Sequence, residues 1–452
     1  MNRYSVKMLS FVAAAAMLGS LTAKAQDKAT LDLLVKKGII TQADADSVAR
    51  SSAAIPVVPH DSNVKKLQLE GDMQIQYDWL TTDDQASGHA NPPATSEFMI
   101  RRAHLGAIAD MGNGWTGELL MDFAAGSQTA SAPQAGVGDA WNLFEKAIIS
   151  DQIDDANGKL SVGYTKVMFG LEETTSANAV KPIERSLGSR YFDESYKGQT
   201  SQRIGFANHH VGIFWDAKVD QIAGLTYGGA LTNGVQTSEQ YTNPGGFNRF
   251  GYWLYAGYTN KIADISYKTG LNLGYTSEGN SNPGPGATAQ ANSVYGYNPY
   301  ITLDYGNFEV SAEFEQAMVT NGRSDSAGRV SRANPYAFSI TPSYMVNKQW
   351  EVVARYSHLN TDGRGTNISD IVRDGENVSN PVPGGLGALF NDADQYYIGL
   401  NWYIMGNSLK WSIGYEYTEF NNRGGPDGAI VYPLTGPRAV VSGLRTRMQI
   451  TF

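Results

Sequence analysis

The chain has 452 residues, with 25 Tyr, 49 Gly, no Cys and a formal net charge of −9. The lack of cysteine excludes disulfide scaffolds and thiolate metal sites, and the acidic balance argues against nucleic acid as a partner. Beyond the N-terminus no apolar run is long enough for a membrane helix. The composition therefore favours a single large β structure.

The N-terminus has the pattern of a secretory signal. Arg3 and Lys7 are basic, residues 8–22 are apolar, and Ala25 closes an A-x-A site before Gln26. This order is typical of a peptide that is removed after export. We predict a signal peptide over residues 1–25 and a mature protein outside the cytoplasm.

Residues 26–66 are predicted to form a periplasmic N-terminal helical segment followed by a linker. The run LDLLVKKGII indicates a short amphipathic helix that stops at Gly38, and a second helix is expected to begin at Thr41. The segment suits either a small module that joins subunits or a loosely ordered leader.

From Leu67 onward the hydrophobic period changes to two. Apolar and aromatic residues up to Trp79 alternate with polar ones from Gln68 to Asp78. A half-buried strand of a soluble protein would show the same alternation. One strand therefore cannot distinguish a membrane barrel from a soluble protein, and the number of similar runs along the chain has to be considered.

Similar runs recur to the end of the chain and predict about sixteen strands with alternately short and long connections. The further runs cover residues 98–110, 115–124, 139–149, 159–168, 203–217, 221–232, 249–260, 265–277, 294–304, 307–319, 335–346, 349–360, 394–405, 407–420 and 443–452. A closed sheet leaves no unpaired backbone in lipid, and sixteen strands leave a wet lumen. The fold class is therefore all-β: we predict a transmembrane antiparallel β-barrel over residues 67–452, with short periplasmic turns and long extracellular loops.

The last strand supports this prediction independently. Leu444, Met448 and Ile450 alternate with Arg445 and Arg447, and the chain ends on Phe452. We expect Phe452 to face outward. A terminal Phe on such a strand is the feature that the outer-membrane assembly machinery recognises.

The third long connection, residues 169–202, is the most distinctive. Loops of this length are usually functional or disordered, and this one carries Lys181, Arg185, Arg190 and Lys197 together with small hydroxyl residues. We predict that it folds into the lumen and controls what passes.

No catalytic or cofactor constellation is evident. The pair His209-His210 is predicted to point to opposite faces of a strand, and no Gly-x-Ser-x-Gly elbow is present. The sequence therefore predicts neither an enzyme nor a cofactor.

Five segments in this order resemble the phosphate-selective porin O/P family: FMIRRAHLG, WTGELLMDFA, DAWNLFEKA, VGYTKVMFGLEETTSANAVKPIERSL and the terminal Phe. The resemblance covers essentially the whole predicted barrel. It implies a homotrimeric outer-membrane channel of sixteen strands with an inward third loop. Where the family shows Thr-Ser-Ser and Phe-Met-Glu-Arg-Ser, this chain has ThrThrSerAla and LysProIleGluArgSer.

The resemblance also implies an anion-binding constriction. The matching substrate-binding residues are Arg101, Arg102, Asp139, Thr175, Ser176 and Arg185, with Lys166 and Lys181 as additions. Guanidinium groups and hydroxyls can replace the hydration shell of a phosphate-like anion. Adjacent strand residues face opposite ways, so one arginine of the pair is expected in the lumen, with the other at an interface, at a bulge or against a neighbouring subunit. Alternatively, both lie in the interfacial girdle.

We therefore predict a passive outer-membrane porin of a Gram-negative bacterium that admits small hydrophilic solutes and prefers small anions such as phosphate. Its other expected contacts are outer-membrane lipid and further copies of itself. The inward-facing positions also carry many carboxylates, including Asp78, Glu313, Glu315, Glu351 and Glu416. A general or sugar-permeable porin with weak selectivity therefore stands as the alternative.

Overall fold

The computed structural model describes residues 63–85, 91–124, 144–194, 203–234, 250–279, 292–324, 330–374, 389–423 and 437–452. The predicted signal peptide, residues 26–62 of the predicted N-terminal segment and Asp139 lie outside these ranges. Leu69–Phe452 forms one compact unit, which contains the sheet described below apart from the first residues of its first strand.

Long strands dominate the described residues. They are β1 (Lys66–Asp84), β2 (Thr95–Gly112), β3 (Trp115–Asp122), β4 (Phe144–Ile153), β5 (Gly158–Lys166), β6 (His209–Lys218), β7 (Leu225–Asn233), β8 (Phe250–Ile262), β9 (Ile265–Gly279), β10 (Asn292–Tyr305), β11 (Phe308–Ser324), β12 (Val330–Ala333), β13 (Tyr336–Met345), β14 (Trp350–Asn360), β15 (Phe390–Asn407), β16 (Leu409–Arg423) and β17 (Ala439–Thr451). The short helices are η2 (Asp154–Ala156), α3 (Leu171–Thr174), η3 (Ser189–Asp193) and α4 (Ile368–Ile371). Within the described ranges, no helix is long and apolar enough to cross a membrane.

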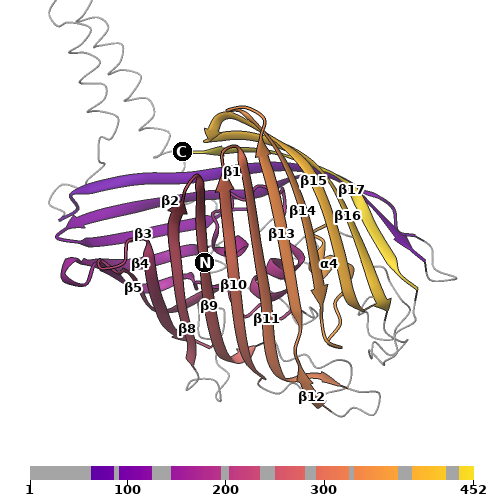
Figure 1. Cartoon of the computed structure of the whole chain (residues 1–452), viewed down its shortest axis with the longest axis horizontal. Coiled ribbons are helices and arrows are strands. Elements are labelled where there is room, and N and C mark those ends of the chain that lie inside the picture. The colour runs from indigo at the N-terminus through magenta and orange to yellow at the C-terminus, as the bar shows by residue number, and fades with distance from the viewer. Residues whose placement is uncertain are drawn as a thin grey trace, which may run out of the picture. The chain divides into compact units, whose positions relative to one another are not determined.

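The strands form one closed antiparallel sheet, which confirms the predicted fold class. Neighbours in sequence pair around the ring, and β17 pairs with β1 to close it (Figure 1). β12 and β13 both pair with β11 and flank Asn334-Pro335, so they are two parts of one wall strand. The described part of the chain therefore forms the sixteen-stranded barrel that the sequence predicts.

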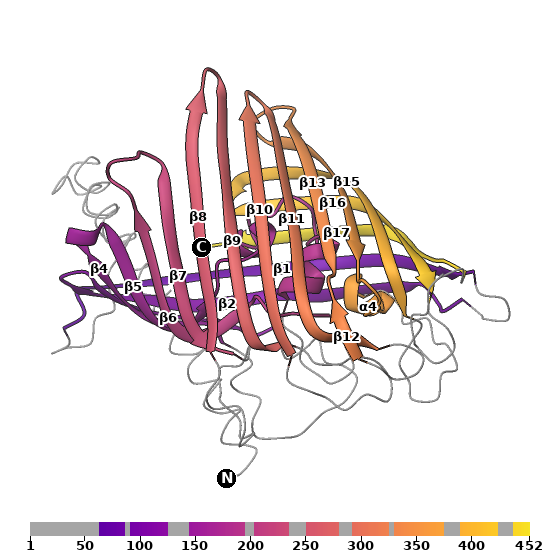
Figure 2. The same ribbon diagram turned by 60° about the horizontal axis from the view of Figure 1, so that its bottom comes forward.

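Short hairpin turns join alternate pairs of strands. Asn113 has φ 52°, and Gly306 and Gly406 both have φ 60°, the left-handed conformation that tight turns need and that glycine adopts without strain. The hairpins β8–β9 and β10–β11 show two of these turns at the upper end of the wall in Figure 2. These turns match the predicted short connections.

The two faces of each strand follow the predicted alternation. Met73, Ile75 and Trp79 are exposed on the outside, whereas Gln76 and Asp78 are fully buried within the barrel. Apolar side chains on the outer wall and polar ones inside are the pattern of a barrel that lies in lipid.

The C-terminal residue also lies where the sequence predicts. The Phe452 side chain is 64 % exposed. Its backbone N–H donates to the carbonyl of Gly71 at 3.0 Å, and its carbonyl accepts from the Gly71 N–H at 3.0 Å. The last residue therefore takes part in closing the barrel and points outward.

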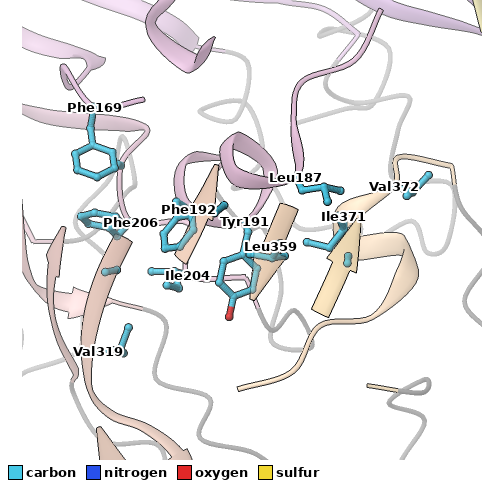
Figure 3. Packing of buried hydrophobic residues seen from close by; sticks show 14 of the residues in the cluster. Phe169, Leu187, Tyr191, Phe192, Ile204, Phe206, Val319, Leu359, Ile371 and Val372 are labelled. Atoms are coloured by element: carbon cyan, nitrogen blue, oxygen red, sulfur yellow. The ribbon is translucent and has the colours of Figure 1, made fainter. Parts of the chain in front are cut away.

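The third loop (residues 167–208, described over 167–194 and 203–208) folds into the barrel in its described parts, as predicted, and forms an apolar cluster with the wall (Figure 3). Tyr191, Phe192 and Phe206 of the loop belong to the same buried cluster as Val319 of β11 and Leu359 of β14. Burying these large side chains stabilises the inward position, since each contributes on the order of 1.5–3 kcal/mol.

Two predicted strands begin several residues later than expected: the run 221–232 is strand only from Leu225, and the run 203–217 shows a larger shift. Residues 203–208 of the predicted run 203–217 are not strand, and β6 begins at His209. Ile204 and Phe206 instead donate backbone hydrogen bonds to the carbonyls of Tyr191 and Phe192, at 2.9 and 2.8 Å. Their alternating apolar pattern therefore reflects packing inside the lumen and not a place in the wall. The predicted run 139–149 is strand from Phe144, and residues 139–143 lie outside the description.

Candidate functional site

The third loop is tied to opposite parts of the barrel wall. The N–H of Leu171 donates to Glu313 Oε2 of β11 at 2.7 Å. Further along the loop, Asn178 accepts a hydrogen bond from Gln74 of β1 at 3.0 Å. Strands β1 and β11 are far apart around the ring, so the loop crosses the lumen and divides it.

Both members of the arginine pair face the lumen. Ile100 is exposed on the outer face, so simple alternation turns Arg101 inward, and Arg101 is buried. His104 contacts Asp72 on the inner face of β1 at 2.6 Å, which places Arg102 on the inner face as well. The alternation is broken between the two arginines, as it is in a β-bulge. Neither arginine lies in the interfacial girdle.

Glu184 is the centre of the basic side of the loop. Arg101 binds it through Nε to Oε1 at 2.8 Å and through Nη2 to Oε2 at 3.0 Å. Arg447 of β17 reaches Oε1 at 2.7 Å, and Arg373, which follows α4, lies 3.5 Å from Oε2. Burial alone raises the pKa of Glu184, but Arg101 and Arg447 hold it well below its ordinary value. The carboxylate therefore stays ionised.

A second carboxylate of the same loop extends this network. Glu194 forms ion pairs with Arg190, with Arg373 at 3.0 Å and with Arg203 at 3.5 Å. Arg190 also donates to the carbonyl of Ile371 in α4 at 3.3 Å. The loop that contains α4 therefore packs on the third loop and contributes a cation to it.

Arg185 and Lys166 share another carboxylate. Glu173 accepts from Lys166 at 2.7 Å and from Arg185 Nε at 3.1 Å. Arg185 also donates to the carbonyls of Glu172 and Thr175, at 3.2 and 3.3 Å. Its guanidinium is thus engaged within the loop and fixes the turn after α3.

The other predicted residues are less closely grouped. Lys181 lies against a different part of the wall, 2.9 Å from both Glu309 and Glu351. The Thr175 hydroxyl donates to the carbonyl of Leu171 at 2.7 Å, whereas the Ser176 side chain is exposed. Asp139 has no described position.

Arg102 differs from the arginines around it. Its Nη1 donates to Gln74 Oε1 at 2.8 Å, and within the described ranges it has no carboxylate partner. The positive charges of Arg101, Arg185 and Arg447 act on it, more strongly than the negative charge of Glu184, and its side chain is partly buried. Arg102 is therefore a cation that can still accept an anion.

An acidic contact lies on the other side of the loop. Asp193 is fully buried beside Glu315 of β11, and both oxygens of Asp193 lack a hydrogen-bond partner within the described structure. Burial raises the pKa of Asp193 well above its ordinary value, and the neighbouring carboxylates of Glu315 and Glu173 raise it further. The protonated form of Asp193 is therefore favoured.

The lumen is hollow beside the loop on the side of strands β3 to β8. A cavity of about 170 Å³ is lined there by Lys146, Lys159, Lys166, Asp216 and Tyr255, among others. No group of three or more His, Asp or Glu side chains in the described ranges is placed to hold a metal ion. The lining combines these polar side chains with apolar ones such as Phe214 and Trp253.

The sequence did not single out two of the residues that surround Glu184. Arg373 lies in a long connection without any motif, and only its contacts reveal its place. Arg447 was recognisable as inward-facing from the alternation of β17, but not as a partner of the third loop. Glu184 itself stands next to Arg185 in the family-like segment, which could have drawn attention to it.

Comparison with known proteins agrees with the porin that the sequence predicts. Residues 68–253 match the family described as phosphate-selective porin O and P. Among solved structures, the anion-selective porin from Comamonas acidovorans is similar, with a TM-score of 0.54 and 11% identity over 86% of this chain and 99% of that chain. The outer membrane channel DcaP of Acinetobacter baumannii gives a TM-score of 0.49 and 11% identity over 86% of this chain and 97% of that chain.

No curated protein matches the chain. The likeness to the Comamonas porin shows a shared fold, and the family match covers the segment that contains the arginine pair and the third loop. Residues 68–253 thus match the phosphate-selective porin O and P family, and with its closed barrel and inward loop the chain has the fold of an outer-membrane porin.

Proposed function

We propose that this porin admits small hydrophilic solutes by passive diffusion and prefers small anions such as phosphate, with Arg102 as the cation they meet in the constriction. The observation that carries the proposal is the environment of Arg102, which lacks a carboxylate partner in the described ranges and lies in the positive field of Arg101, Arg185 and Arg447. A guanidinium that is not already paired can offer its donors to a passing anion.

The proposal assigns unequal roles to the predicted residues. Arg101, Arg185 and Lys166 are paired with Glu184 and Glu173, so they hold the loop and supply a background field. The exposed hydroxyl of Ser176 is available to a solute, whereas that of Thr175 is used within the loop. Weak binding of this kind suits a channel, because the ion must also leave.

A general or sugar-permeable porin with weak selectivity is the second candidate. It is favoured by the number of lumen cations that carboxylates neutralise, such as Arg355 by Glu172 at 2.8 Å and Arg445 by Asp78 and Glu416. In that case the local fields largely cancel, and size alone would select solutes.

The family match over residues 68–253 also supports three further expectations. The chain is exported with residues 1–25 as a cleaved signal peptide, the outer-membrane assembly machinery recognises Phe452, and three copies assemble into a homotrimer. The outward position of Phe452 is compatible with such recognition.

The reversal potential in a planar bilayer under a KCl gradient, with and without phosphate, tests the proposal. We expect a chloride-side potential and a chloride current that phosphate blocks. Arg102→Gln should reduce the chloride-side potential and the phosphate block by several-fold. Lys268→Gln, which removes a cation in contact with Tyr300 on β10, should change the potential and the block little. A potassium-side potential with no block would favour the general porin.

A further inference from the structure

The donors around Glu184 form a site that suits an oxyanion. Its two oxygens accept from Arg101 Nε and Nη2, from Arg447 Nη2 at 2.7 Å and from Gln76 Nε2 at 3.1 Å. Arg373 Nε lies within 3.5 Å. Several convergent guanidinium donors are the usual recognition set for phosphate as well as for carboxylate.

These donors are also held by contacts other than Glu184. Arg447 Nε donates to Gln76 Oε1 of β1 at 2.8 Å. Arg373 pairs with Glu194, and its carbonyl accepts from Arg445 Nη2 at 2.7 Å. The two arginines therefore have supports of their own, so the arginine site does not depend on Glu184 alone for its shape.

Glu184 enters this site from a different element than its partners. Arg101 belongs to β2 and Arg447 to β17, whereas Glu184 is carried by the third loop. Together with Glu194, which shares Arg373, two carboxylates face five guanidinium groups, so the local positive charge exceeds the negative charge. The partly buried Arg102 lies next to the site along β2 and within the field of Arg101 and Arg447. A permeating anion held by Arg102 is thus close to the same donors.

We propose that Glu184 is a specificity-determining residue, a tethered carboxylate that occupies an oxyanion site made by Arg101, Arg373 and Arg447 and competes there with inorganic phosphate. The inference rests on the proposed function in one respect, since it requires that anions reach the constriction. A group on the same chain acts at a high effective concentration. The native channel therefore binds phosphate more weakly than its arginines alone would.

The test compares the native full chain with Glu184→Gln in planar bilayers, measuring block of the chloride current by inorganic phosphate. Glutamine keeps the shape of the side chain but loses its charge, so the arginines become available to phosphate. We expect about tenfold stronger block, which corresponds to about 1.4 kcal/mol.

A matched control separates this effect from a general change in lumen charge. Glu351→Gln also removes a buried lumen carboxylate, one that contacts Lys181, Asn401 and Tyr403 and not the arginine site. Both variants should shift the reversal potential toward chloride, but only Glu184→Gln should strengthen phosphate block. Heat-modifiable migration on a detergent gel reports whether each barrel is folded.

The outcomes distinguish the inference from the proposed function. A native channel that phosphate blocks, with unchanged or weaker block in Glu184→Gln, overturns the inference alone. Block that appears only in Glu184→Gln supports the inference and overturns a phosphate preference of the native channel, and block in neither overturns both. If Glu184→Gln does not fold, Glu184→Asp replaces it: the shorter carboxylate should strengthen block about threefold, and block equal to native would overturn the inference.

Discussion

Two buried carboxyl groups of the third loop, Glu184 and Asp193, show how the surroundings shift the ionisation of a carboxyl group in opposite directions. Glu184 lies among three arginines and keeps its charge. Asp193 faces the carboxyl of Glu315, without a hydrogen-bond donor among the described residues, and its pKa is raised. The loop therefore has an ionic contact on its arginine side and a proton-dependent contact on its acidic side.

The comparison teaches that the loop's two attachments should respond to different disturbances. A buried ion pair is sensitive to the removal of either partner, because the remaining charge is left without compensation. A pair of carboxyl groups is sensitive to loss of the proton, because two like charges in contact repel. The experiments below separate these responses.

Removing a cation from the arginine side should have the largest effect. Arg101→Ala takes away both guanidinium contacts to Glu184 and should lower the free energy of unfolding by about 3–5 kcal/mol. Thermal unfolding in detergent, followed by circular dichroism, measures the change. Arg323→Gln, which breaks the more exposed pair with Asp362, should cost no more than about 1 kcal/mol. Equal losses in the two variants would contradict the ionic attachment.

Raising the pH should weaken the acidic side. The folded pKa of Asp193 lies above its unfolded value, so its contribution to stability is complete below the unfolded pKa and is lost as the pH rises through the folded pKa. Between the unfolded and the folded pKa, each pH unit should cost about 1.4 kcal/mol, and above the folded pKa this loss is complete. The difference in melting temperature between the native chain and Asp193→Asn, measured as a function of pH, reports this loss.

The amide of Asp193→Asn cannot ionise, so the variant should lack this part of the alkaline destabilisation. A difference between the two proteins that stays constant at all pH values would show that Asp193 is already ionised in the folded channel.

Lys181 lies against another part of the wall, and its substitution should give the smallest loss of stability. It contacts Glu309, Glu351 and Ser343, yet Glu351 retains the donors Asn401 and Tyr403 when the lysine is lost. Lys181→Met should therefore cost only about 1 kcal/mol, measured by the same thermal unfolding. A loss as large as that of Arg101→Ala would mean that the loop is held equally at every contact.

Much of the barrel could be predicted from the sequence because strand alternation and turn chemistry are local. In β17, the period of two placed Met448 and Ile450 outside and Arg445 and Arg447 inside, as the structure confirms. The same rule failed for Ile204 and Phe206, whose alternation comes from packing within the third loop and not from a place in the wall.

The constriction shows the limit of local information. The sequence by itself determined the closed sixteen-stranded sheet, its outward apolar face and an inward third loop rich in cations, since periodicity and chain length fix these features. Only the tertiary structure decided which cations are paired. Glu184, Arg373 and Arg447 lie far apart in the chain and meet because barrel closure brings β17 beside β1 and because two long loops fold onto each other. Electrostatic pairing depends on distances in space, and separation along the chain does not encode them.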